Sequence, residues 1–514
     1  MSQAYLTPYN DSVGQFALLQ KVTSRTGGVT NVTYVPNTDS SVVQNDGISG
    51  DRRLVKEIYQ EDGRGNTVNR ARFLYTDGFY DTARERSLGF RKVRATLPTI
   101  SGETSAPYVE SIYDNESYRY NGVLSKITRF VNGEEALRID YDYATRTSGK
   151  GPWKATLSRA MYETWDGGAY VQSITTYAAN KFGENTRISA IGYSDAGATD
   201  LDPGDTLVTN LTYAPDTAKY IVANPTQVDH RTSGGTLIAR NTFAYDGRGN
   251  LTEVKGWTGT GSETRRVAAF VYDARGNVTT RRGPRSGQDT TYAYGGPASL
   301  FRTRETNALG HATTTTWNYG CQLPLTTRDP NALTTTLTYD AQCREATRTL
   351  PGGHKITTTY ENFGTPASQA VRVSQPSAAA SAPANVERTY FDGLGRTYRA
   401  TRTGAANVAA DRINTILSYD ARSNLRTRST PLVGENPSVP NNRRTIFDYD
   451  GLDRLTKTTF PGDGSQYETR AYVATENTPL GGGAAIRFRS VRVKDADCYP
   501  AAANAPCGET PTAT

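Results

Sequence analysis

The chain is poor in the residue types from which most active sites and metal sites are built. Its 514 residues include only 3 histidines and 4 cysteines. Few histidines leave little capacity for general acid and base chemistry near neutral pH. His311, Cys321, Cys343 and His354 could bind zinc only if repeated segments brought them together, because no two of them are close in sequence. The sequence therefore predicts no metal site and no cofactor, with this zinc set as a minor alternative.

The short motifs of common catalytic centres are also absent. The chain has no Gly-x-Ser-x-Gly elbow, no His-Glu-x-x-His and no phosphate-binding loop. Asp450 and Asp453 could be read as the acid pair of a glycosidase, which needs two carboxyl groups beside the bond. Acids of this kind recur in turn after turn along the chain. We therefore expect a protein that is not an enzyme, with a carbohydrate-active enzyme as a remote alternative.

Long apolar runs are missing as well. No stretch of about 20 apolar residues occurs, which predicts no membrane insertion by this chain. The segment 1–5 has no basic residues leading into an apolar run, so no signal peptide is expected.

Four cysteines are too few for a disulfide scaffold. Cys498 and Cys507 flank a short loop rich in Pro and Ala, and their redox state depends on the compartment.

Charge does not point to nucleic acid. The net charge is +7, with 58 Lys and Arg against 51 Asp and Glu, and the two signs are interleaved. No nucleic-acid-binding motif accompanies the basic residues. Arginines such as Arg265, Arg266, Arg281 and Arg282 fit solvated strand faces and protected sheet edges. We therefore predict that the chain does not bind nucleic acid.

What the chain has is a repeated phrase. Phe243 to Leu251 reads Phe-Ala-Tyr-Asp-Gly-Arg-Gly-Asn-Leu, and Phe270 to Val278 reads Phe-Val-Tyr-Asp-Ala-Arg-Gly-Asn-Val. Further copies follow at intervals of about 20 to 30 residues, the range typical of repeat architectures. The predicted structural repeat residues are Tyr245, Asp246, Gly249, Tyr272, Asp273, Gly276, Tyr339, Asp340, Phe391, Asp392, Gly395, Tyr419, Asp420, Tyr449, Asp450 and Arg454.

Each copy predicts a β-hairpin. The residues before the tyrosine alternate with period two, which is typical of a strand. Asp after the tyrosine can bond the backbone ahead of it, and Gly or Asn tolerates a positive φ, so the phrase predicts a tight turn. Phe243, Phe270, Trp317, Leu337, Leu417 and Phe447 should share one sheet face with the residue two positions later. Threonines such as Thr334, Thr336 and Thr338 would leave the other face wet.

Composition agrees with a single sheet. Hydrophobic residues make up 36% of the chain, or about 39% when glycine is counted and tyrosine is left out. Ordinary globular domains reach roughly 45–50%. A content of 10% aromatic residues argues against disorder as the explanation. A sheet with one drier face and one wet face needs less apolar material than a thick core.

The phrase Tyr-Asp-x-x-Gly-Arg/Asn-Leu resembles the YD repeat of the RHS family of bacterial polymorphic toxins and related shell proteins. The run Tyr80 to Val93, which contains Leu-Gly-Phe, resembles the middle region of the B component of bacterial Tc toxins. The resemblance implies an all-β fold in which an array of YD-repeat hairpins forms a curved, spiralling sheet that is part of a hollow shell. It also implies three regions, namely 1–240, the repeat array 241–475 and an irregular segment 476–514.

The same resemblance implies a function. The chain would be a structural shell segment that encloses and shields a toxin polypeptide, together with a second shell-forming chain, similar to a C component, or with missing flanking domains. It would be made in the bacterial cytoplasm and secreted by a route that the chain does not encode. The alternative is a cell-surface or wall-associated adhesion protein. Asp329-Pro330-Asn331-Ala332-Leu333 is similar to the family's self-cleavage motif, but Ala332 replaces its glycine, so we do not expect cleavage here.

Overall fold

The structure is a computed structural model. The structure describes residues 18–48, 52–115, 122–145, 155–166, 169–194, 204–261, 263–377, 384–404, 408–478 and 486–495. Cys498 and Cys507 lie outside these ranges.

The described residues form β-strands and three short 3-10 helices, with no α-helix among them. The first strands are β1 (Lys21–Thr23), β2 (Val29–Pro36), β3 (Val43–Gln44), β4 (Arg53–Glu61), β5 (Thr67–Asp81), β6 (Arg86–Thr96), β7 (Tyr108–Asp114), β8 (Val123–Val131), β9 (Glu134–Thr145), β10 (Ala155–Asp166), β11 (Ala169–Ala179), β12 (Asn185–Ser194), β13 (Leu207–Tyr213) and β14 (Pro225–Thr232). The middle strands are β15 (Leu237–Tyr245), β16 (Leu251–Trp257), β17 (Thr264–Tyr272), β18 (Val278–Arg282), β19 (Asp289–Gly295), β20 (Phe301–Thr306), β21 (Ala312–Asn318), β22 (Leu323–Arg328), β23 (Thr334–Tyr339), β24 (Glu345–Thr349) and β25 (Lys355–Glu361). The last strands are β26 (Ala370–Gln375), β27 (Asn385–Phe391), β28 (Thr397–Arg402), β29 (Ile413–Tyr419), β30 (Leu425–Ser429), β31 (Leu432–Val433), β32 (Arg444–Tyr449), β33 (Leu455–Thr459), β34 (Tyr467–Thr478) and β35 (Ile486–Asp495). The 3-10 helices are η1 (Pro297–Ser299), η2 (Ala409–Asp411) and η3 (Asn441–Arg443).

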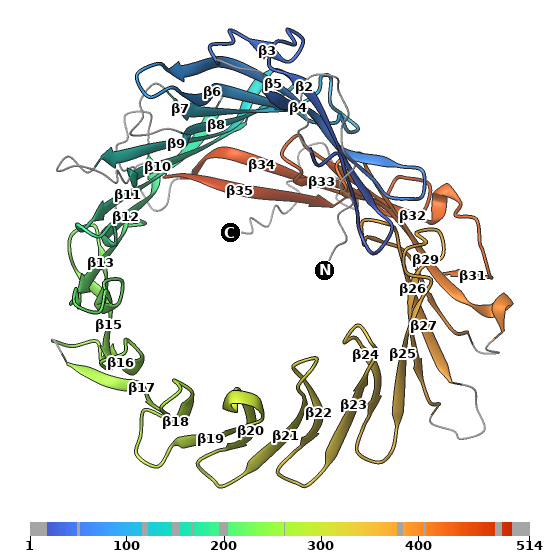
Figure 1. The fold of residues 1–514 in the computed structure, drawn as a ribbon. Coiled ribbons are helices and arrows are strands. Elements are labelled where there is room, and N and C mark those ends of the chain that lie inside the picture. The colour runs from blue at the N-terminus through green and yellow to red at the C-terminus, as the bar shows by residue number, and fades with distance from the viewer. Residues whose placement is uncertain are drawn as a thin grey trace.

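The strands form one long antiparallel meander. Apart from β3 and β31, each strand pairs with the strands before and after it in this order, and the parallel pairing of β3 with β5 is an exception. The sheet curves round so that its strands stand as a ring, and the last hairpin, β34 and β35, lies inside the ring beside β10 and β11 (Figure 1). This confirms the all-β, curved and spiralling sheet expected from the repeats. Strands β15 and β34 cross residues 240 and 475, so the proposed three regions remain a division of the sequence pattern.

The wall is essentially one sheet thick. The chain exposes 29358 Å², whereas a compact monomer of its mass would expose about 18,000 Å². Most strand residues are half-buried, and the one described cluster of buried apolar side chains is Val42, Val43, Ile48 and Phe90. Val93 packs against this cluster, so the Leu-Gly-Phe strand of the N-terminal part helps to form a small local core. The lean composition of the chain follows from this architecture.

The predicted alternation of faces is confirmed in β15, β17, β23 and β29, whereas Tyr319, two residues after Trp317, is 47% exposed, and Asp448 of β32 is half-buried like its neighbours. Leu337 and Tyr339 are half-buried, and Thr338 between them is exposed. The same pattern holds for Phe243 and Tyr245 of β15, and it recurs in β17 and β29. The exposed face carries threonines that bond across strands, as in the hydroxyl pair of Thr338 and Thr347 at 2.7 Å. Hydroxyl groups satisfy one another there and still meet water, which keeps this face hydrated.

The beginning and the end of the described wall touch through their hairpin turns. The Gly393 N–H donates to the Asp62 carbonyl oxygen at 2.7 Å, and the Thr26 hydroxyl donates to the Gly393 carbonyl oxygen at 2.6 Å. In the same contact, the Asn69 N–H of β5 donates to the Ala421 carbonyl oxygen in the turn after β29, at 2.8 Å. These backbone contacts join residues more than 300 positions apart in the sequence. The sheet therefore completes one turn of a spiral and begins to stack on itself.

Charged side chains reinforce the same contact. Arg422 lies 2.9 Å from Glu103, and both side chains are buried, at 6% and 4% exposure. Arg129 donates to Asp453 at 2.8 Å. A paired guanidinium and carboxylate offset each other's loss of hydration, whereas removing one partner leaves a buried charge alone. The ion pairs therefore fix which turns meet.

We predict that this contact depends on the size of residue 393. A Cβ at Gly393 would lie 2.5 Å from Gly28 atoms, so Gly393→Ala forces the two turns apart and should cost about 1–3 kcal/mol, as overpacking does. Gly247 has the same place in its own turn, and a Cβ there would find only the Lys219 Nζ at 3.5 Å. Gly247→Ala is the matched control and should be nearly neutral in denaturant melts. Equal losses for the two variants would contradict the spiral contact.

Candidate functional site: the Tyr-Asp turns

The aspartate of each repeat holds its own turn closed. The Asp246 Oδ1 accepts hydrogen bonds from the Arg248 N–H and the Asn250 N–H, both at 2.9 Å, and its Oδ2 accepts from the Asn250 side-chain amide at 2.9 Å. The side-chain bond from Asn250 and the backbone bonds favour the carboxylate, so they lower the pKa of Asp246. The same set of bonds recurs at Asp273 and Asp420. The predicted role of these aspartates as turn formers therefore has a direct geometric basis.

The fourth residue of the turn takes a positive φ. Gly249, Gly276 and Gly395 have φ values of 86°, 89° and 81°. Cys343, Ser423 and Asp453 hold the same position in other repeats, with φ values of 62°, 69° and 63°. A residue with a Cβ in this region carries a modest strain, which the fixed hydrogen bonds of the turn must outweigh. The turn geometry is thus set by the aspartate and kept even where glycine is lost.

The tyrosine of each repeat bonds the hairpin before its own. The Tyr272 hydroxyl donates to the Leu251 carbonyl oxygen at 2.6 Å, and the Tyr449 hydroxyl donates to the Leu425 carbonyl oxygen at 2.9 Å. Tyrosines that donate in the same way are Tyr245 to Pro225, Tyr294 to Val278, Tyr339 to Pro324, Tyr419 to Thr397 and Tyr472 to Leu455. Each acceptor lies at the start of the strand that leaves the previous turn.

Register explains why this carbonyl needs a partner. Leu251 pairs with Tyr245 inside its own hairpin, but pairing of β16 with β17 starts only at Glu253. The Leu251 carbonyl therefore lies beyond the end of that ladder, where the backbones diverge. The phenol of Tyr272 spans this gap and supplies the missing donor. Since unpaired backbone carbonyls are costly in partly buried places, the tyrosine closes the ladder between successive hairpins.

The repeat at Phe391 departs from this pattern. Phenylalanine has no hydroxyl, and here the pairing of β26 with β27 extends to Ala370 and Tyr390, next to the turn. The buried Gln369 side chain donates to the carbonyl oxygens of Phe391, Asp392 and Thr26, at 3.1, 2.8 and 2.9 Å. Gln369 is 0% exposed and lies where the end of the wall meets its beginning. Gln369 was not among the predicted residues, because its partner Thr26 lies 343 positions away in the sequence.

Arginine at the end of the turn links neighbouring repeats. The Arg344 guanidinium donates from Nε to the Asp340 Oδ2 at 2.7 Å and stacks over the Tyr360 ring at 3.9 Å. Arg454 bonds its own Asp450 in the same way and covers the Tyr472 ring at 4.3 Å. The bond from Arg344 is the main reason that the pKa of Asp340 is lowered. Each such arginine therefore holds its own turn and the tyrosine of a following strand at once.

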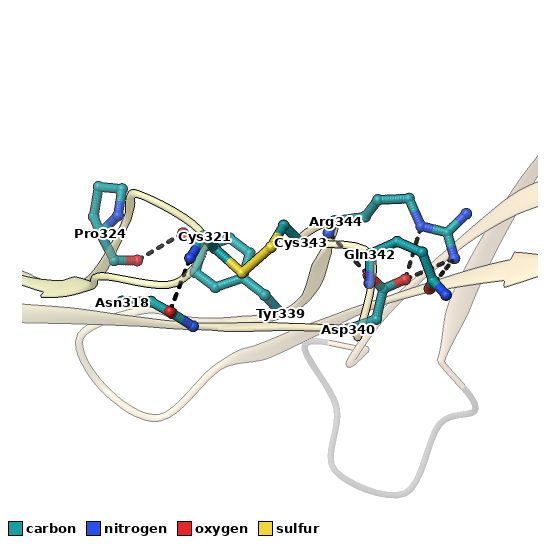
Figure 2. The surroundings of a disulfide bond; sticks show 8 residues. All are labelled: Asn318, Cys321, Pro324, Tyr339, Asp340, Gln342, Cys343 and Arg344. Atoms are coloured by element: carbon teal, nitrogen blue, oxygen red, sulfur yellow. Dashed lines mark hydrogen bonds and ion pairs between the residues drawn. A yellow bond between two sulfur atoms is a disulfide. The ribbon is translucent and has the colours of Figure 1, made fainter. Parts of the chain in front are cut away.

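A disulfide ties the turn after β21 to the turn after β23. Cys321 and Cys343 are bonded with an S–S distance of 2.07 Å and a Cα separation of 5.4 Å. Figure 2 shows the bond beside Tyr339, whose hydroxyl reaches Pro324 in the preceding hairpin. In the chain-entropy model, closing a loop of this size contributes about 3 kcal/mol. The zinc alternative for His311, Cys321, Cys343 and His354 is therefore wrong, because neither sulfur is a free thiolate.

The structure assigns no chemistry to the other candidates. Asp450 caps its turn through the Leu452 and Arg454 N–H groups, and Asp453 accepts from the Arg129 guanidinium and the Asn424 amide. The interpretation of this pair as glycosidase acids is therefore replaced by two structural roles.

Among the described residues, no group of three or more His, Cys, Asp or Glu side chains could hold a metal ion. The described part of the chain also contains no helix long and apolar enough to cross a membrane.

We predict separate losses for the hydroxyl and the ring of Tyr339. Tyr339→Phe removes only the donor to Pro324 and should cost about 1–3 kcal/mol, because that carbonyl loses its partner. Tyr339→Ala also removes the ring and should cost about 3–5 kcal/mol. Tyr419, which donates to Thr397, should behave alike, and denaturant melts measure both. A loss under about 1 kcal/mol for both alanine variants would mean that the tyrosines do not hold the wall together.

Alkaline pH should unfold the wall through the same tyrosines. Burial raises the pKa of Tyr245, Tyr272, Tyr339 and Tyr419 above the ordinary value of 10.0, and it raises the pKa of Tyr75 to about 12. A raised pKa in the folded state means that the stabilisation is complete below pH 10 and is lost as the pH rises through the folded pKa. Thermal melts between pH 9 and pH 12 should show a steep fall that becomes shallower in Tyr245→Phe. An unchanged slope would contradict the role of the hydroxyl.

Comparison with known proteins identifies the architecture. No protein-family model and no curated protein sequence matches the chain. Among solved structures, the chain is similar to TcdB2-TccC3 with a TM-score of 0.70 and 10% identity, over 94% of this chain and 34% of that one. It is also similar to TcdB2-TccC3 without its hypervariable C-terminal region, with a TM-score of 0.71 and 10% identity, over 93% of this chain and 36% of that one.

The chain is also similar to a chain in the structure of a Tc holotoxin pore of Photorhabdus luminescens, with a TM-score of 0.69 and 10% identity, over 94% of this chain and 37% of that one. The chain thus spans about a third of the length of these structural neighbours. At this identity the likeness shows the fold. Nearly the whole chain shares its fold with part of TcdB2-TccC3, as the repeated Tyr-Asp phrase and the Leu-Gly-Phe strand led us to expect.

Proposed function

We propose that the chain is a structural segment of a toxin shell of the RHS and Tc type, which encloses a toxin polypeptide and shields it from the surroundings. The observation that carries this proposal is the curved, single-layer wall with turns that stack into a spiral, in a fold shared with TcdB2-TccC3.

The partners are a cargo polypeptide and a second shell-forming chain or flanking domains, since one turn of a spiral leaves sheet edges that need covering. The role is one of containment and involves no catalysis by the described residues. The Cys321–Cys343 disulfide fits a protein that works outside the bacterial cytoplasm after export by another component. An adhesion protein built from the same repeats is the second candidate, supported by exposed aromatic side chains at turns such as Tyr220, which is 80% exposed.

The test is protection of the cargo in the assembled complex. The chain is co-expressed with a second shell-forming chain and its cargo polypeptide, and the complex is treated with a protease. We expect the cargo to be cut far more slowly in the complex than after the shell is opened with urea. Cleavage at the rate of the free cargo would contradict containment, and binding of the isolated chain to cell surfaces would then favour adhesion.

A further inference from the structure

The Cys321–Cys343 disulfide closes the open end of one joint between two hairpins. The joint is formed by β22 and β23, which share three residue pairs that end at Thr326 and Thr336. Between that end and the Tyr-Asp turns the two strands are joined by side chains. The Tyr339 hydroxyl bonds a carbonyl oxygen of β22 at 2.6 Å, and the disulfide links the two turns beyond it (Figure 2). The joint therefore rests on a short ladder, one tyrosine and one covalent bond.

Other joints of the wall link their neighbouring Tyr-Asp turns by hydrogen bonds. The Arg248 guanidinium donates to the Ala274 carbonyl oxygen of the next turn at 2.7 Å. The Arg396 guanidinium donates in the same way to the Ser423 hydroxyl at 3.0 Å. Reductants do not break such bonds. Within the described ranges, the joint of β22 with β23 is the one whose turns are linked covalently.

Both turns of this joint depart from the repeat. Asn318 takes the place of the turn aspartate, and its Oδ1 accepts from the Cys321 N–H at 3.1 Å, whereas the Asp246 Oδ1 accepts from two N–H groups. In the second turn, Cys343 has a φ of 62° at the position that glycine holds in turn 246–250. A residue with a Cβ carries some strain at such a position. The disulfide thus holds together two turns whose own local support is reduced.

The joint lies in an arc of the wall that only its neighbours support. Strands β20 to β25 stand on the other side of the ring from β3 and β5 (Figure 1). In the described chain, the hydrogen bonds and ion pairs of residues 301–358 reach the same hairpin or an adjacent one and no more distant segment. Opening of the joint therefore breaks the contacts of that joint and leaves the spiral contact intact.

The bond lies where a dissolved thiol can meet it. Cys321 and Cys343 are half-buried, and the exposed Gln322 and Gln342 stand directly beside them in the chain. Tyr319, in the first of the two turns, is 47% exposed. Thiol–disulfide exchange requires access of a thiolate to one of the two sulfurs. We therefore expect the bond to be reducible in the folded wall.

We propose that the Cys321–Cys343 disulfide is a redox-operated staple, which locks the joint of β22 with β23 outside the cell and releases it in a reducing compartment. A small thiol such as glutathione attacks one sulfur as its thiolate and forms a mixed disulfide, which a second thiol displaces. The two thiols supply two electrons and two protons, so Cys321 and Cys343 become thiols and the reductant leaves as its own disulfide. The inference concerns the wall itself and does not depend on the proposed containment of a cargo.

The test is hydrogen exchange of the isolated chain, folded and without denaturant, before and after treatment with dithiothreitol. Peptides that cover 323–328 and 334–339 report on the joint, and alkylation followed by mass measurement shows whether the bond is reduced. We expect exchange in these peptides to become at least about tenfold faster on reduction, because the joint keeps only its ladder and Tyr339. Peptides of β16 and β17, whose turns are linked by Arg248, should change by less than about twofold.

The matched control is the double variant Cys321→Ser, Cys343→Ser. It should exchange like the reduced chain in both peptides, and dithiothreitol should change nothing further. This control also separates the staple from any effect of reductant on Cys498 or Cys507. In the unsubstituted chain, oxidised glutathione should restore the slow exchange after dithiothreitol is removed.

Three results would overturn the inference, and none of them bears on the proposed function. The bond could resist dithiothreitol until denaturant is added, which would make it a permanent cross-link. It could be reduced while exchange in 323–328 and 334–339 stays the same, so that it holds nothing in place. Reduction could also speed exchange equally in every strand, which would make the bond a general stabiliser of the wall and no local staple.

Discussion

The bond from a tyrosine hydroxyl to a backbone carbonyl of the preceding hairpin is the interaction on which the wall depends. An isolated hairpin is marginally stable in water, because it buries little surface and leaves both edges unpaired. Along this chain, backbone pairing between hairpins stops two residues short of the turn, as at Leu251 and Leu425. Tyr272 and Tyr449 fill those places from the next hairpin. Stability is therefore built between neighbours, which is the logic of repeat proteins.

The same constraint accounts for the shape. A sheet held by contacts between neighbours needs no second layer, so it can extend for hundreds of residues with few buried apolar side chains. Its twist then has to close or spiral, since flat sheets over many strands are unusual. In this chain the spiral contact uses small residues and ion pairs, such as Gly393 against Gly28 and Arg422 against Glu103, instead of an apolar core. The turns thus serve both the hairpin and the stacking of one spiral turn on another.

Much of this could be predicted from the sequence because the repeat is local. The alternation before each tyrosine gave the strands, the aspartate gave the turn, and the resemblance to YD repeats gave the curved sheet. The contacts that join distant parts were not predictable in this way. Gln369, Asp62 and Glu103 are buried only because a turn some hundreds of residues away covers them. The pairing of Cys321 with Cys343 was not predicted, since it depends on which turns lie side by side.

The most direct test of a hollow, single-layer wall is small-angle scattering from the isolated monomer. A compact globule of 514 residues has a radius of gyration near 24 Å. The spiral wall predicts a radius well above that value, with a distance distribution whose maximum lies beyond half of the largest dimension, as for a ring. A radius at or below about 24 Å with the profile of a solid sphere would contradict the wall and the enclosure that it is proposed to provide.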